Sequence, residues 1–265
     1  METRVDVLDH GYVGLVESWG SDARIIESAR MSTGKGFLGW GGTCRRCHRE
    51  RRPIAENGPT GCDDGAVIHN EHDFIDVGDE KLLRYLWENK HATPFEMAGM
   101  TIEIQAPIFV FREWHRHRTQ SYSELSARYT PLPNVNYVPS VERLMINAGT
   151  SNKQAGTIQA ALALTEKQAR LFQEALREHY NHAEILYQSA LNQGIPKELA
   201  RVHLPVGRYS RMRASANLRN WLGFLTLRMA PAAQWEIRQF AIAVGEIVRE
   251  NFPHTWELFA REGGR

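Results

Sequence analysis

The sequence predicts an α+β protein, and three features indicate this class. Residues 5–11 and 100–105 alternate apolar and polar side chains, which is typical of half-buried strands. Other segments repeat apolar residues at the three- and four-residue spacing of amphipathic helices. The chain has 265 residues, of which 42% are hydrophobic, so it can bury a substantial core. This length is compatible with one large domain or two small ones, and we expect a single domain over residues 1–265.

Helix signals follow the N-terminal strand in the first third of the chain. Ser21 and Asp22 can cap a helix over residues 23–31, and apolar spacing predicts another helix over residues 80–89. Pro94 can occupy the first position of a further short helix. Thr93 would then be its N-cap, with Glu96 as the capping-box partner.

The remaining segments are mainly helical. We expect a helix over residues 108–115 that follows Pro107, and an irregular segment over 129–140. The longest helical pattern covers 154–193, with a break expected near 179–182, and a short helix or turn is expected over 196–205. Further helices are expected over 214–229 and 234–251. In the first of these, Asn217, Trp221, Phe224 and Arg228 would share one face, so Arg228 must meet either an acid or a ligand.

The overall charge argues against a general nucleic-acid binder. Lys and Arg total 32 and Asp and Glu total 31, which gives a formal net charge of +1. No apolar run approaches the roughly 20 residues of a membrane span, and the N-terminus lacks the pattern of a secretory signal. The expected location is therefore the cytosol of a cell or of a virus-infected host.

Residues 34–78 differ in composition from the rest and are expected to form a loop-rich insertion. The segment is rich in Gly, Arg, Asp and Asn, and it contains all three cysteines, Cys44, Cys47 and Cys62. This spacing suits a structural zinc site, with His48, His69 or His72 as the fourth ligand. The alternative is that these are thiols without a metal, and the sequence does not decide between the two.

The segment with the most varied chemistry runs from Arg116 to Tyr129. Its three arginines supply cationic forks for phosphate or carboxylate, and its serines and threonine supply short hydroxyls. His117 can titrate near neutral pH, and Glu124 adds an acceptor. Such a mixture suits an anionic ligand that carries hydroxyls and ring nitrogens, and a nucleotide is such a ligand.

The same segment resembles a known signature. Arg116-His117-Arg118, Ser121, Ser126 and Arg128 match, at the same spacing, the motif of the flavin-dependent thymidylate synthases. The segment from His91 to Glu96 is similar to a motif that lies close to the flavin in that family. The segments 217–219, 227–228 and 233–237 resemble the family's C-terminal motifs.

The resemblance implies both a fold and an activity. The fold would be a central antiparallel sheet with surrounding helices. The enzyme would be a flavoprotein methyltransferase of dTMP biosynthesis that converts dUMP to dTMP. FAD would be its cofactor, methylenetetrahydrofolate its carbon donor and NADPH its reductant. It would act as a homotetramer whose sites combine residues from different subunits, with no nucleic-acid or membrane partner.

The resemblance also assigns residues to roles. Those implied to contact FAD are Ser32, Thr93, Arg116, His117, Arg118, Glu124, Asn217 and Arg219. Those implied to contact dUMP are Glu113, Arg116, Glu124, Leu125, Ser126, Ala127, Arg128, Arg201 and Arg228. His91 would position folate or flavin. Arg228 is the expected catalytic residue, because a guanidinium cannot act as a base at neutral pH but can stabilise negative charge that develops on the uracil ring.

Three positions depart from the family pattern. Glu113 stands where glutamine is usual, Ala127 replaces a common glycine, and Gly223 stands where Asn or His often contacts FAD. These departures keep open a flavoprotein of the same fold that acts on a modified uracil nucleotide. A zinc-stabilised nucleic-acid-binding protein is the alternative of another class. A thymidylate synthase that uses a catalytic cysteine is disfavoured, because every cysteine lies in the insertion.

Overall fold

A computed structural model describes residues 3–40, 79–146 and 164–261, together with the backbone of short strands between Thr43 and Ile75. The chain divides into two compact units. The first, which we call the sheet unit, comprises Met1–Glu17, Thr101–Ala216 and Gly223–Ile247. The second unit comprises Ser18–Met100, Asn217–Leu222 and Val248–Arg265. Across the described ranges, no helix has both the length and the apolar character needed to cross a bilayer.

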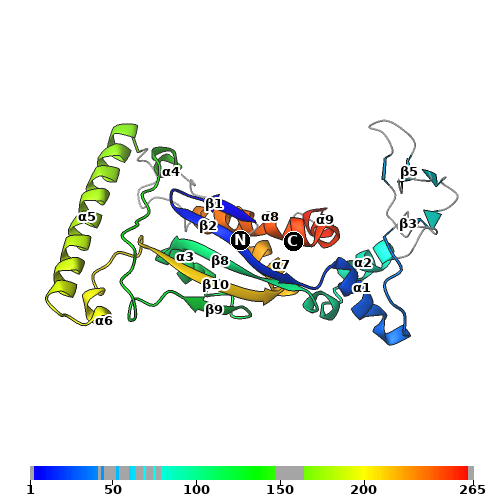
Figure 1. The fold of residues 1–265 in the computed structure, drawn as a ribbon. Helices are drawn as coiled ribbons and strands as arrows, with labels where there is room; N and C mark the ends of the chain where they lie inside the picture. Colours follow the sequence, from blue (N-terminus) through cyan, green and yellow to red (C-terminus); the bar gives the residue numbers. More distant parts are fainter. Residues whose placement is uncertain are drawn as a thin grey trace. The chain divides into compact units, whose positions relative to one another are not determined.

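The sheet unit is built on a five-stranded sheet with the strand order β1-β2-β8-β10-β9. Strand β1 pairs antiparallel with β2, and Val7 lies opposite Gly11; β10 pairs antiparallel with β9, and Ser215 lies opposite Ser121. The strands are β1 (Arg4–Val7), β2 (Gly11–Trp19), β8 (Gly99–Pro107), β9 (Ser121–Glu124) and β10 (Tyr209–Asn217). This antiparallel sheet with surrounding helices confirms the predicted fold class (Figure 1).

One face of the sheet is apolar and packs against helices. Along β8 and β10 buried residues alternate with more exposed ones, as expected for strands with a single covered face. The core is completed by α3 (Ile108–Trp114), α7 (Leu218–Arg228) and α8 (Trp235–Asn251). Gly11 allows close packing, because a Cβ there would lie 2.7 Å from the main-chain oxygen of Val7 and 2.8 Å from the ring of Phe240 in α8. Figure 1 shows α7 and α8 beside the strands.

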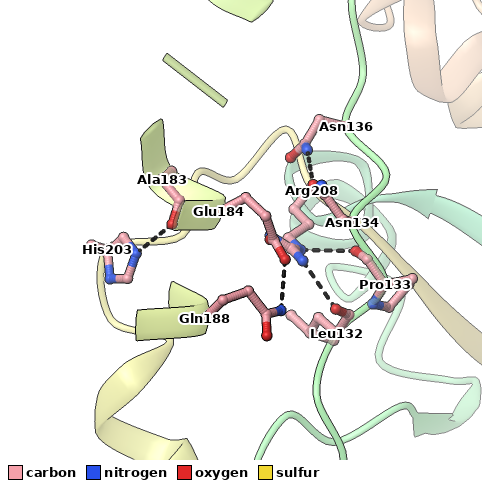
Figure 2. Close-up of polar contacts among 9 residues, drawn as sticks. All are labelled: Leu132, Pro133, Asn134, Asn136, Ala183, Glu184, Gln188, His203 and Arg208. Carbon is pink, nitrogen blue, oxygen red and sulfur yellow. Dashed lines mark hydrogen bonds and ion pairs between the residues drawn. The ribbon is translucent and has the colours of Figure 1, made fainter. Parts of the chain in front are cut away.

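The long helix α5 (Glu166–Asn192) belongs to the sheet unit and is anchored through polar contacts (Figure 1). Arg208 is buried, with 1% of its side chain exposed, and its guanidinium bonds Glu184 of α5 at 2.6 Å. The same group donates to the main-chain oxygens of Pro133 and Leu132, both at 2.9 Å (Figure 2). Arg208 thus ties two segments that are distant in sequence, α5 and the loop at residues 132–133, to the start of β10.

Smaller helices complete the sheet unit. Helix α4 (Val141–Met145) is capped by Ser140, and α6 (Lys197–Ala200) follows Pro196. Tyr180 of α5 donates to the main-chain oxygen of Tyr137, so α5 also contacts the irregular segment that precedes α4. The predicted break near 179–182 is wrong, because α5 is one continuous helix from Glu166 to Asn192. The part of this prediction before residue 164 lies outside the described residues.

The second unit is held together by two buried aspartates. Asp79 pairs with Arg30 and accepts from the amide of Gly39 at 2.9 Å. Asp22 accepts from the amide and the hydroxyl of Thr255. The helices of this unit are α1 (Asp22–Arg30), η1 (Met31–Thr33), α2 (Asp79–Glu88), η3 (Thr93–Glu96) and α9 (Pro253–Arg261).

Short strands cross the Cys-containing segment. They are β3 (Thr43–Cys44), β4 (Arg52–Pro53), β5 (Thr60–Asp63), β6 (Ile68–His69) and β7 (Phe74–Ile75). Cys62 lies opposite His69 in the antiparallel pair β5–β6, and Cys44 lies opposite Phe74 in β3–β7. Cys47 and the side chains of Cys44 and Cys62 lie outside the described part of the chain, so the predicted zinc site stays a prediction. Among the residues that are described, no group of three or more His, Cys, Asp or Glu could hold a metal ion.

Two local predictions were corrected by the structure, and one further helix was found. The expected helix over 214–229 begins only at Leu218, because the chain before it continues β10 and pairs with β9. Thr93 is not an N-cap: it lies within η3, whose N-cap is Ala92 and makes no side-chain capping bond. The helix predicted over 234–251 is confirmed as α8, and it is followed by α9, which was not predicted.

Candidate active site

The C-terminal ends of α3 and α7 meet through aromatic side chains in the sheet unit. Trp114 of α3 stacks on Phe224 of α7 with ring centroids 4.6 Å apart. The ring of His117, just beyond α3, meets Phe224 edge-on at 4.9 Å. The hydroxyl of Tyr122 in β9 donates to the main-chain oxygen of His117 at 2.7 Å. These contacts fix the first residues of the Arg116–Tyr129 segment beside α7.

Arg228 lies at the end of α7, and its guanidinium donates to three acceptors. Nη1 donates to Oε2 of Glu113 at 2.7 Å, and Nη2 donates to the main-chain oxygen of Glu113 at 2.7 Å. Nε donates to Nε2 of His117 at 2.8 Å. Because Phe224 and Arg228 are one helical turn apart, the ring contact and the guanidinium contacts fall on the same face of α7. The sequence predicted that Arg228 meets either an acid or a ligand. The structure shows the acid, which is Glu113.

His117 is held as a neutral imidazole. Burial and the neighbouring Arg228 guanidinium lower the pKa of His117 from its ordinary value of 6.5 to about 4, although Glu113 opposes the shift. Since Nε2 accepts the proton of Arg228 Nε, the ring proton must reside on Nδ1. His117 therefore presents one N–H donor and carries no charge at neutral pH.

The titration of His117 is a direct test of this arrangement. In the folded protein we expect an NMR-detected pKa of about 4, and in the Arg228→Ala variant a pKa closer to 6.5. Between these values the unfolded chain binds a proton that the folded chain does not, so the free energy of unfolding should fall as the pH is lowered from 6.5 towards 4. A His117 pKa of 6.5 in the unmodified protein would contradict the hydrogen bond from Arg228.

The loop after β9 forms a second cluster in the sheet unit. The hydroxyl of Ser126 accepts from the amide of Arg128 at 3.3 Å, and the guanidinium of Arg128 pairs with Glu198 of α6 at 3.0 Å. Arg128 is 62% exposed, so this ion pair is readily exchanged with another anion. A cleft of about 570 Å³ opens beside the pair, with Lys197 and Leu191 among the residues that line it.

The other predicted residues of the sheet unit surround these two clusters. Arg116 and Arg118 are exposed just after α3, where their charges complement the helix C-terminus. The amide of Leu125 bonds the main-chain oxygen of Arg211 and thereby extends the pairing of β9 with β10. Glu124 ends β9 and is exposed, whereas Arg201 is the half-buried C-cap of α6.

The second unit carries the remaining predicted residues. Ser32 in η1 and Thr93 in η3 are exposed, and His91 is exposed with its ring edge-on to Tyr85. Asn217 accepts from the amide of Asn220 at 3.0 Å and so caps the start of α7. Arg219 pairs with Glu96. The capping-box role expected for Glu96 is therefore replaced by an ion pair.

Two of the family departures have simple structural consequences. Ala127 is buried and does not have a positive φ, so the loop does not require glycine there. A Cβ at Gly223 would meet no atom within 4 Å, so α7 presents an open surface at that position. The sequence alone did not predict that Glu113 pairs with Arg228 or that Glu198 pairs with Arg128. Each acid is distant in sequence from its arginine, and neither pair follows a helical spacing.

The five-stranded sheet and its surrounding helices define an α+β protein whose arginine-rich segment offers exposed cations. The sequence model of the family described as "Thymidylate synthase complementing protein" matches residues 14–254. A flavin-dependent thymidylate synthase of Thermus thermophilus is 35% identical over 255 residues, covering 96% of this chain and 77% of the relative. That of Thermosipho melanesiensis is 32% identical over 255 residues, covering 96% and 93%. The chain therefore belongs to the family of flavin-dependent thymidylate synthases.

A solved structure is similar over nearly the full length. The UMP/dUMP methylase PolB from Streptomyces cacaoi, bound with 5-Br UMP, superposes with a TM-score of 0.73 at 26% sequence identity and covers 98% of both chains. The complex with 5-Br dUMP gives a TM-score of 0.71. The fold of this chain is thus shared with a nucleotide methylase as well as with the thymidylate synthases.

The residues present fit a flavin nucleotide. A diphosphate needs cations and hydrogen-bond donors, and the exposed Arg116 and Arg118 supply both. The Nδ1–H of neutral His117 is a further donor. The donor set therefore agrees in chemistry with the cofactor that the family name states.

Proposed function

We propose that this protein is a thymidylate synthase that converts dUMP to dTMP, with FAD as cofactor, methylenetetrahydrofolate as carbon donor and NADPH as reductant. The observation that best supports the reaction is the fixed guanidinium of Arg228. Its three hydrogen bonds to Glu113 and His117 leave two of the five guanidinium N–H groups for a ligand. A donor held in place before the substrate binds is what stabilisation of a developing oxyanion requires.

Arg228 acts on the uracil ring in this proposal. Its free N–H groups donate to the ring carbonyl oxygen O4 and stabilise the negative charge that develops there, which polarises C5 and C6. FAD supplies the hydride chemistry when it is bound, because no side chain can do so. The aromatic contacts of Phe224 with Trp114 and His117 hold the end of α7 beside His117. They thereby keep the guanidinium of Arg228 in one position.

The substrate phosphate is proposed to bind the loop after β9. Arg128 exchanges Glu198 for the phosphate, and the Ser126 hydroxyl and the amides near Leu125 and Ala127 add donors. Arg201 and Arg116 supply further positive charge. His91 and the second-unit residues Ser32, Thr93, Asn217 and Arg219 are proposed to contact the flavin or the folate. The enzyme is proposed to work as a single catalytic domain over residues 1–265 in the cytosol, with residues 34–78 as an insertion.

Product analysis tests the reaction. Purified protein with FAD, NADPH and methylenetetrahydrofolate should convert dUMP to dTMP, identified by chromatography and mass spectrometry. The PolB similarity makes UMP the essential second substrate to test. Formation of dTMP supports the proposal. Exclusive methylation of UMP or of a modified uracil nucleotide would replace it with the related methylase activity.

A shared site in a homotetramer is proposed as well. Apolar side chains on α5 that are at least half exposed would be covered by another subunit; they are Leu171, Phe172, Ile185 and Leu186. In this proposal one subunit supplies the loop after β9 and another supplies Arg228. Co-refolding Arg128→Ala and Arg228→Ala chains should then restore part of the activity, because some of the mixed sites contain both arginines. Each variant alone should show only a small residual activity. No recovery in tetramers shown to contain both chains would contradict sharing.

A further inference from the structure

Arg228 is distinguished from the other candidate ligand arginines of the sheet unit by the burial of its paired guanidinium. Only 15% of its side chain is exposed, and it carries a carboxylate at 2.7 Å from Glu113. A largely buried guanidinium needs such a partner, because desolvation of an unpaired charge is costly. The pair of Arg128 with Glu198 is mainly exposed, and Arg116 and Arg118 lie at the surface. The carboxylate of Glu113 is therefore bound to a largely desolvated guanidinium, whereas the pair of Arg128 with Glu198 is solvated and opens more readily.

The position of Glu113 makes the counter-charge part of the arginine's geometry. Its side chain and its own main-chain oxygen accept from the two terminal nitrogens of Arg228, so one residue orients both ends of the fork. His117 holds the remaining Nε–H and contributes no charge, because its pKa is lowered to about 4. The local cluster of Arg228, Glu113 and His117 is thus close to neutral at pH 7.

We infer that Glu113 is a specificity residue that reserves Arg228 for a neutral carbonyl group and directs the phosphate of the nucleotide to other arginines. A guanidinium with a bound carboxylate can still donate hydrogen bonds, but it attracts a phosphate dianion only weakly because that dianion also meets the carboxylate. The nucleotide is thereby oriented, with its base at Arg228. This inference rests on the proposed function, since it assumes a uracil nucleotide as the substrate.

The charge of Glu113 is separable from its hydrogen bonds. Glu113→Gln keeps the side-chain length, an amide oxygen that can accept from Nη1, and the main-chain bond to Nη2. The variant therefore removes mainly the negative charge. Glu166→Gln is the matched control, because Glu166 pairs with Arg170 on the exposed surface of α5 and its change removes one carboxylate away from the motif.

Calorimetric binding of inorganic phosphate, deoxyuridine and dUMP to the FAD-loaded enzyme tests the inference. We expect phosphate to bind Glu113→Gln at least about tenfold more tightly than the unmodified enzyme. The reason is that the guanidinium of Arg228 can then make a charged hydrogen bond to the phosphate. The affinity for deoxyuridine should not rise. High concentrations of dUMP should inhibit the variant, because the nucleotide can then also bind in the reversed orientation, with its phosphate at Arg228. Glu166→Gln should match the unmodified enzyme.

A double variant locates the effect. Glu113→Gln with Arg228→Met should lose the added phosphate affinity, because the newly exposed charge is then gone. The inference is overturned if phosphate binds Glu113→Gln no more tightly, if deoxyuridine gains as much as phosphate, or if the gain survives in the double variant. Failure of the unmodified enzyme to bind dUMP and deoxyuridine would instead contradict the proposed function, while the phosphate measurements would still decide the role of Glu113.

Discussion

Replacement of Arg228 by alanine is expected to lower kcat/KM for dUMP by about 10²–10³-fold, the usual cost of removing one preorganised donor to a developing oxyanion. The loss should fall mainly on kcat, because the guanidinium is proposed to stabilise charge that is absent from the bound ground state. Steady-state kinetics at saturating NADPH and methylenetetrahydrofolate would measure it, and the flavin absorbance would show whether the cofactor is retained.

Arg261→Ala provides the matched control for this prediction. Arg261 pairs with Glu257 on the exposed surface of α9, so its removal deletes a guanidinium and a salt bridge without touching the motif. Its kinetics should equal those of the unmodified enzyme. Arg228→Ala with unchanged kcat would exclude Arg228 as the residue that stabilises the uracil ring, and attention would move to the other arginines of the signature.

Arg208→Ala is expected to destabilise the sheet unit by about 3–5 kcal/mol, the range seen when one partner of a buried pair is removed. The change leaves Glu184 without its cation and the main-chain oxygens of Leu132 and Pro133 without their donor. The sheet strand β10 and helix α5 lose their shared anchor (Figure 2). The midpoint of thermal unfolding should therefore drop by roughly 10 °C.

A paired substitution separates the two contributions to this loss. Arg208→Met together with Glu184→Met removes both charges, so no carboxylate is left unpaired, and part of the lost stability should return. Calorimetry of the single and double variants measures this. A shift of less than about one degree in Arg208→Ala would show that the cluster contributes little to the stability of the sheet unit.

Local patterns predicted the parts of the fold that depend on neighbouring residues. Alternation over 100–105 correctly indicated β8, and Ser21 correctly marked the N-cap of α1. Strand β10 was mistaken for the start of a helix, because Ala214 and Ala216 are good helix formers and the pairing with β9 is visible only in three dimensions. Tertiary pairing here outweighed local propensity.

The candidate site was predictable in its residue types but not in its pairings. The signature from Arg116 to Arg128 predicts nucleotide-binding chemistry, because it combines cations with short hydroxyls, and this assignment stays a prediction. The contacts of Arg228 with Glu113 and of Arg128 with Glu198 join residues 115 and 70 positions apart. No periodicity links such distant positions, so the buried pairing that distinguishes Arg228 emerged only from the structure.

The most direct measurement of the central claim is the visible absorption spectrum of the purified protein, followed by NADPH oxidation with and without dUMP. We predict a yellow protein with flavin bands whose NADPH oxidation responds to dUMP and yields dTMP when methylenetetrahydrofolate is present. A colourless protein that FAD does not reconstitute would contradict the proposed function. The function would then have to be sought in the segment that carries Cys44, Cys47 and Cys62.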